Sequence, residues 1–100
     1  MAVGDQGNYV LLFENQASDA TGTGFTIASN ARGHYISVAG DIGGGTVQIE
    51  MEIGGNWAAV DGGLFDAVGV KFLEGASGGK KLRAVLAGAT APDITVAVTK

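Results

Sequence analysis

The chain has 100 residues, of which 18 are glycine, one is proline and none is cysteine, and its formal net charge is −4. This length corresponds to one domain, and the lack of cysteine excludes disulfides, thiolate chemistry and cysteine-ligated metals. Six basic residues in an acidic chain argue against a nucleic-acid partner, because lysine and arginine at the phosphates supply most of that affinity. We expect a soluble protein, since the N-terminal segment lacks the pattern of a signal peptide and the glycine-broken apolar runs are too short to span a membrane.

Apolar residues alternate with polar or small ones along most of the chain, with the period of two residues that is typical of β-strands. The clearest segment is TVQIEMEI at 46–53, and HYISVA at 34–39 places its isoleucine and valine on one face and its tyrosine and serine on the other. The other predicted strands lie at 8–13, 24–29, 56–60, 68–74, 80–87 and 93–99, with turn-forming residues between them. Only residues 64–70 are compatible with a helical turn.

These segments predict an all-β protein, a single antiparallel β-sandwich with an Ig-like or jelly-roll-like arrangement of about eight short strands. The domain is expected to cover residues 1–100, with 1–7 as a flexible or partner-contacting arm. In the segment 68–74, the alternating apolar residues are Val68, Val70 and Phe72.

A two-glycine connection, Gly54 and Gly55, joins 46–53 to 56–60 as a tight hairpin. We expect the apolar set of 46–53 to form a central core strand, and Trp57, the single tryptophan, to return across the hairpin and cap that core. The glutamine and glutamates of 46–53 would then lie on a solvated outer face. The competing interpretation is a binding face formed by those polar residues with Trp57 at its tip.

Residues suited to catalysis are few. His34, the single histidine, has no carboxylate or serine at a recognisable spacing, and we expect it at the surface, at the end of a strand. Glu50 and Glu52 point to the same face about 7 Å apart, as residues two apart on a strand do, but a carboxylate pair of a glycosidase normally comes from different strands around a cleft. The solvated face is therefore the favoured interpretation.

The sequence also lacks a complete phosphate-binding loop and a complete calcium-binding loop. The segment GDIGGG at 40–45 runs into a strand, without the lysine, serine or threonine and helix of a phosphate-binding loop. The aspartates of the loops do not follow the spacing of a calcium-binding loop. We predict no catalytic, cofactor-binding or metal-binding residues, and we do not expect an enzyme.

Four segments of residues 40–99 carry a resemblance to a known class of proteins. They are TVQIEMEI after a glycine-rich turn, NWAAV at 56–60, LRAVLAGAT at 82–90 and ITVAV at 94–98. In this order they resemble small β-sandwich virion proteins of tailed bacteriophages. The turn in EIGGNW is shorter than the loop that those proteins often carry there, so a function located in that loop is not transferred.

The resemblance implies a structural virion protein, a capsid decoration (cement) protein that binds the outer capsid surface after synthesis in the host cytoplasm. A head-fibre or tail accessory domain is the related alternative. Its partner would be the major capsid protein or another virion protein, bound as a monomer or a homotrimer through many weak contacts, with no cofactor. The candidate contact residues are Tyr9, Leu12, Tyr35, Leu64, Phe65, Lys80 and Lys81.

A function of another class remains open on the same sequence. A carbohydrate-binding or adhesion module needs an exposed aromatic platform beside polar groups. The sequence offers such groups in Trp57, Tyr9 and Tyr35 and in the acidic strand face. The cluster of Lys80, Lys81 and Arg83 suits either an anionic partner or a solvated hairpin end.

Overall fold

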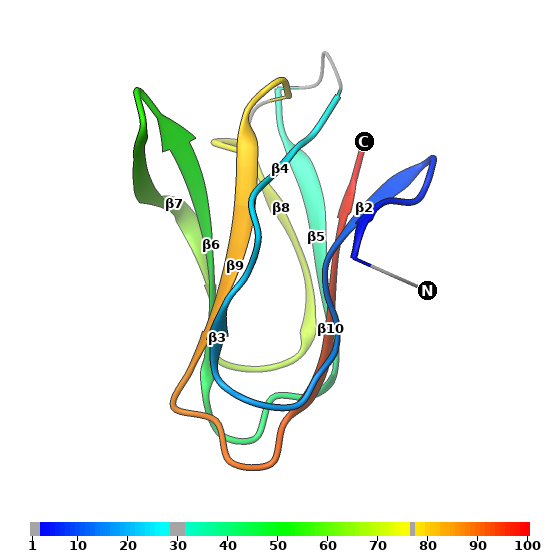
Figure 1. The fold of residues 1–100 in the computed structure, drawn as a ribbon, viewed down its shortest axis with the longest axis vertical. Helices are drawn as coiled ribbons and strands as arrows, with labels where there is room; N and C mark the ends of the chain where they lie inside the picture. Colours follow the sequence, from blue (N-terminus) through cyan, green and yellow to red (C-terminus); the bar gives the residue numbers. More distant parts are fainter. Residues whose placement is uncertain (1–2, 29–31, 77) are drawn as a thin grey trace.

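The computed structural model describes residues 3–28, 32–76 and 78–100, which form strands, turns and bends without a helix (Figure 1). The ten strands are β1 (Gly4–Asp5), β2 (Tyr9–Gln16), β3 (Ala20–Thr21), β4 (Phe25–Thr26), β5 (His34–Asp41), β6 (Thr46–Ile53), β7 (Asn56–Phe65), β8 (Gly69–Leu73), β9 (Lys81–Ala87) and β10 (Asp93–Thr99). The predicted all-β class is confirmed. Each of the predicted strand segments contains a strand, and β1 and β3 are additional two-residue strands.

The strands form two antiparallel sheets of five strands, which we call sheet A and sheet B. Sheet A has the order β1-β2-β10-β5-β8, and sheet B has the order β3-β9-β6-β7, with β4 also paired to β9. One long antiparallel ribbon begins at the β6–β7 hairpin. Along this ribbon, β5 pairs with β8, then β3 and β4 pair with β9, and finally β2 pairs with β10. The ribbon is rolled so that β10 also pairs with β5 and β9 with β6. This is the jelly-roll arrangement, and not the Ig-like one.

The core lies between the inner faces of the two sheets, and strand alternation supplies it. In β6, Val47 and Ile49 are completely buried, while their neighbours along the strand are only partly so. In β5, Ile36 and Val38 face inward, and Tyr35 is exposed on the opposite face. The period-two pattern therefore determines the buried side of both strands, as predicted. The expected core set of 46–53 does not hold over the whole strand: Met51 is only partly buried and Ile53 is 59% exposed, because Ile53 lies beside the hairpin turn, beyond the β6–β9 pairing that ends at Met51.

Three side chains expected at the surface are buried. Leu12 and Phe65, which we predicted to be partner contacts, are about 1% exposed and belong to the core. Leu12 lies beside a register irregularity between β2 and β10, and Phe65 is opposite the inward-facing Val47. His34 is also about 1% exposed, because it stands two residues before the inward-facing Ile36 on β5.

Residues 64–70 form no helical turn. Leu64 and Phe65 continue β7, where they pair with Gln48 and Val47 of β6, and the chain then bends into β8. Pairing with an extended neighbour holds Leu64 and Phe65 in the strand conformation, so the one segment compatible with a helical turn does not form it.

Trp57 also lies on the other side of the sheet from the one predicted. The hairpin pairs Ile53 with Asn56 and Glu52 with Trp57, and opposite residues of an antiparallel pair share a face. Trp57 therefore stands on the outer face of sheet B with the glutamates, and does not cap the core.

Candidate docking surface

The outer face of sheet A carries two rows of side chains that cross four strands. In the first, which we call the aromatic row, Tyr9 of β2 is opposite Thr99 of β10, and Tyr35 of β5 is opposite Phe72 of β8. The two halves meet where the Tyr35 backbone N–H donates to the Thr99 hydroxyl, over 3.0 Å. Side chains from β2, β10, β5 and β8 thus form a continuous line across the sheet.

The second row runs parallel to the first and lies two residues away from it on each strand, later in β2 and β5 and earlier in β10 and β8. Ala97 of β10 is opposite both Leu11 of β2 and Ser37 of β5, and Ser37 is opposite Val70 of β8. We call Leu11, Ala97, Ser37 and Val70 the aliphatic row. The two rows together are the uncharged face, because none of their side chains carries a charge.

Exposure increases across the uncharged face toward β8. Leu11 is buried, whereas Tyr35, Phe72 and Val70 are 56, 53 and 64% exposed. The rings of Tyr35 and Phe72 meet edge to face, with centroids 4.9 Å apart and an interplanar angle of 61°. Such a contact holds both rings in one orientation, so the β8 end presents an ordered apolar surface to solvent.

The one charged residue of β8 is turned away from this face. The Lys71 ammonium donates a hydrogen bond to the Leu64 carbonyl oxygen over 2.7 Å and lies 4.8 Å from the centroid of the Phe65 ring. Both contacts are with β7 of sheet B. Lys71 therefore bridges the two sheets, and its charge does not lie on the side of Val70 and Phe72.

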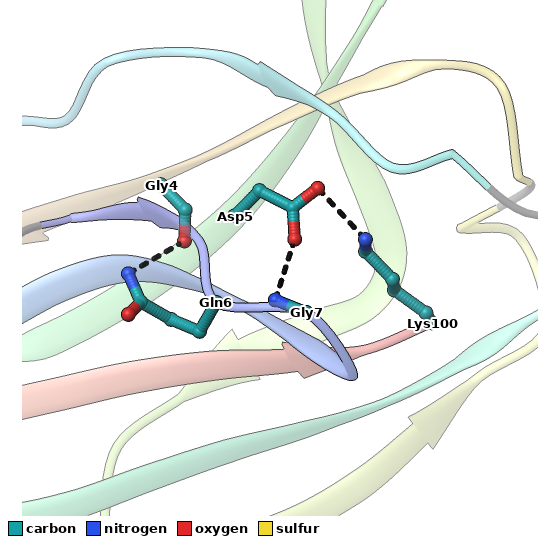
Figure 2. Close-up of polar contacts among 5 residues, drawn as sticks. All are labelled: Gly4, Asp5, Gln6, Gly7 and Lys100. Carbon is teal, nitrogen blue, oxygen red and sulfur yellow. Dashed lines mark hydrogen bonds and ion pairs between the residues drawn. The ribbon is translucent and has the colours of Figure 1, made fainter.

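At the β1 end, the charges beside the aromatic row neutralise each other (Figure 2). The Asp5 carboxylate forms an ion pair with the Lys100 ammonium, over 2.7 Å, and accepts a hydrogen bond from the Gly7 backbone N–H, over 2.8 Å. The hydrogen bond from Lys100, followed by that from Gly7, lowers the pKa of Asp5 below its ordinary value. Residues 4–7, part of the expected arm, thus comprise β1, which pairs with β2 and is joined to Lys100 by the Asp5 ion pair, and the start of the bend that follows. Residues 1–2 lie outside the described residues.

The outer face of sheet B is different in character. Arg83 of β9 lies 2.7 Å from Glu50 of β6, and its guanidinium carbon lies 4.3 Å from the centroid of the Trp57 ring. The edge of the indole rests against Gly24, where an added Cβ would lie 2.5 Å from the ring. One face and one edge of the tryptophan are therefore covered by the protein itself.

The structure brings together only some of the predicted contact residues. Tyr9 and Tyr35 lie on the uncharged face, whereas Leu64, Lys80 and Lys81 are exposed on or beside strands of sheet B. Sequence reasoning missed Phe72, Val70, Thr99 and Ala97. The alternation of Val70 and Phe72 was visible in 68–74, but alternation alone does not say which face is the buried one.

The described residues offer few features of a metal site, a membrane span or a ligand pocket. Among 3–28, 32–76 and 78–100, no group of three or more histidine, aspartate or glutamate side chains could hold a metal ion, and no helix is long and apolar enough to cross a membrane. A cavity of about 180 Å³ opens beside β2 and β3, and its lining carries no charged side chain. The lining residues are Val3, Leu12, Phe13, Gln16, Ala20, Thr21, Gly22 and Thr23.

Comparisons of the chain with protein-family models, with curated proteins and with solved structures give no match.

Proposed function

We propose that this protein is a structural virion protein, a capsid decoration protein that docks on the outer surface of an assembled particle through its uncharged face. The observation that carries the proposal is the exposed, ordered apolar group of Tyr35, Phe72 and Val70 at the β8 end of sheet A. Aromatic residues are enriched, and charged residues are depleted, at the centres of protein interfaces. The resemblance of residues 40–99 to small phage virion proteins supports the choice of partner, the major capsid protein.

The uncharged face suits attachment in many copies. Its hydroxyl and methyl groups, on Ser37, Thr99 and Ala97, are small and lie between larger side chains, which favours a flat contact. One such contact is weak by itself, because association must first offset the loss of rotational and translational freedom. Repeated contacts across a capsid lattice, by monomers or homotrimers, would add to strong attachment and link neighbouring capsid subunits.

Co-sedimentation with undecorated capsids of the phage that encodes the chain tests this proposal. We expect the wild-type protein to pellet with the capsids and to raise the temperature at which they break open. Val70→Glu and Phe72→Glu should abolish both effects, since each would bury a charge at the contact. Leu64→Glu is the matched control, because Leu64 is 50% exposed but lies on β7 of sheet B. Absence of wild-type binding, or equal loss in the control, contradicts the proposal.

The carbohydrate-binding alternative has less support from the geometry. A sugar-binding tryptophan offers an open ring face, but the guanidinium of Arg83 occupies one face of Trp57. Binding of glycans with a change in Trp57 fluorescence would favour this alternative over capsid docking.

A further inference from the structure

The backbone of β8 has one paired edge and one open edge. Sheet A ends at β8, whose only described pairing is with β5. The strand covers Gly69–Leu73, so its open edge offers a short row of hydrogen-bonding groups to another chain.

The hydrogen bond between Tyr35 and Thr99 shows which of these groups point outward. The Tyr35 N–H donates toward β10, so the backbone polar groups of Tyr35 do not face β8. Tyr35 and Phe72 are therefore a non-hydrogen-bonded pair of the β5–β8 ladder, the kind in which side chains approach most closely. It follows that the N–H and C=O groups of Phe72, and of Val70 two residues earlier, point to the open edge.

The usual protections of an open edge are weak at β8. Lys71, the one charged residue of the strand, directs its ammonium to Leu64 of the other sheet. Val70 and Phe72 carry both the outward backbone groups and exposed apolar side chains. An extended chain laid along this edge would therefore gain backbone hydrogen bonds and side-chain contacts together.

The remaining sheet edges are less suited to pairing. β1, β3 and β4 are two residues long. β7 is longer, but a register shift interrupts its pairing with β6. Gly62 and Gly63 lie within this irregular part of β7. Among the described strands, β8 is the regular, unguarded edge.

We propose that the open edge of β8 binds an extended segment of a partner protein by strand addition. The segment would hydrogen-bond to Val70 and Phe72 and place β-branched or aromatic residues at alternate positions beside their side chains. A second copy of this chain is the less suitable occupant, because pairing along a five-residue strand would have to supply most of the ~1,000 Å² of a stable dimer, whereas a partner already docked on the uncharged face does not depend on the strand alone. The inference deepens the proposed docking function, since it specifies how a partner backbone is recognised.

Selection from a display library of random linear peptides, with the wild-type chain as target, tests the inference. We expect the selected peptides to alternate β-branched or aromatic residues with others and to slow amide hydrogen exchange at Val70 and Phe72. Val70→Pro removes an outward N–H and should weaken their binding about tenfold or more, as loss of a hydrogen bond together with the proline ring would. Val70→Thr keeps the N–H and a β-branched side chain, and should bind like the wild type.

Several outcomes would overturn strand addition. One is a failure to select any peptide, and another is equal binding by a folded Val70→Pro protein. If the proline variant does not fold, peptide binding to the wild type without protection of the Val70 and Phe72 amides decides against the proposal. Protection that rises with protein concentration alone would assign the edge to a second copy. If capsid binding survives Val70→Pro but not Val70→Glu, face docking stands and strand addition falls.

Discussion

Arg83 and Glu50 form a shielded ion pair on the outer face of sheet B. Both Nε and Nη2 of Arg83 lie 2.7 Å from Glu50 Oε1, and the two side chains are only 23 and 22% exposed. The same guanidinium lies over the Trp57 ring, so one arginine links strands β6, β7 and β9.

Replacing Glu50 with Gln should lower the free energy of unfolding by about 1–2 kcal/mol, between the values for exposed ion pairs and for hydrogen bonds to charged groups. The fold should remain intact. Urea denaturation followed by circular dichroism measures the loss. Glu52→Gln is the control, because Glu52 has no described ion pair with Arg83, and an equal effect of both variants would contradict the role assigned to Glu50.

Trp57→Ala should be tolerated better than truncation of a core residue. Ile49→Ala is expected to cost about 2–5 kcal/mol, as for other fully buried aliphatic residues, and Trp57→Ala should cost less because the indole lies outside the core. Chemical denaturation of the two variants compares them. Unfolding of the Trp57→Ala protein under native conditions would show that the indole has a larger structural role.

Gly24→Ala tests the contact at the indole edge. An added methyl group would lie 2.5 Å from the ring, so the indole has to move away from β4 and from its position under Arg83. We expect a shift of Trp57 fluorescence toward the solvent-exposed wavelength, with a small loss of stability. An unchanged emission spectrum would contradict the packing described for this edge.

His34 is buried, and both of its ring nitrogens lack a hydrogen-bond partner among the described residues. A buried polar group without a partner costs about 1–3 kcal/mol, so His34→Leu should raise the free energy of unfolding by a comparable amount. His34→Gln, which keeps a polar side chain, should give no such gain. Denaturant titration decides, and destabilisation by leucine would indicate that the imidazole is hydrogen-bonded in solution.

The lowered pKa of Asp5 predicts a pH dependence at the junction of β1 and β10. Lys100 is the main cause, so Lys100→Ala should raise the pKa of Asp5 toward its ordinary 3.8. Because the folded-state pKa lies below the unfolded one, the stabilising contribution is present above the ordinary pKa and disappears as pH falls through the lowered value. An NMR titration of the Asp5 carboxyl carbon in both proteins measures the shift, and identical titration curves would refute the pairing.

Alternation in the sequence was sufficient to predict the inward side of β5 and β6, where charged or hydroxyl-bearing residues mark the other side. It was insufficient for β8, whose sequence GVKFL carries apolar residues on both sides. There the buried side follows from pairing with β5, which is distant in the chain. The side of Trp57 could have been derived, because a two-glycine hairpin after an outward Glu52 determines it.

The candidate docking surface was less accessible to sequence reasoning. Tyr9, Tyr35, Phe72 and Thr99 come from four strands that span nearly the whole chain, and their common row depends on the register of three strand pairs. No local pattern contains this information. The burial of His34 was likewise hidden, since a histidine at the start of a strand follows the face of its neighbours.

The central place of β10 in sheet A has a consequence for how the protein folds. β10 lies between β2 and β5, yet it follows every other strand in the chain. Until β10 emerges from the ribosome, β2 and β5 lack their shared partner, and the sheet cannot close. Non-local pairing of this kind slows folding, so we expect sheet A to form late, after the β6–β7 hairpin and its local neighbours.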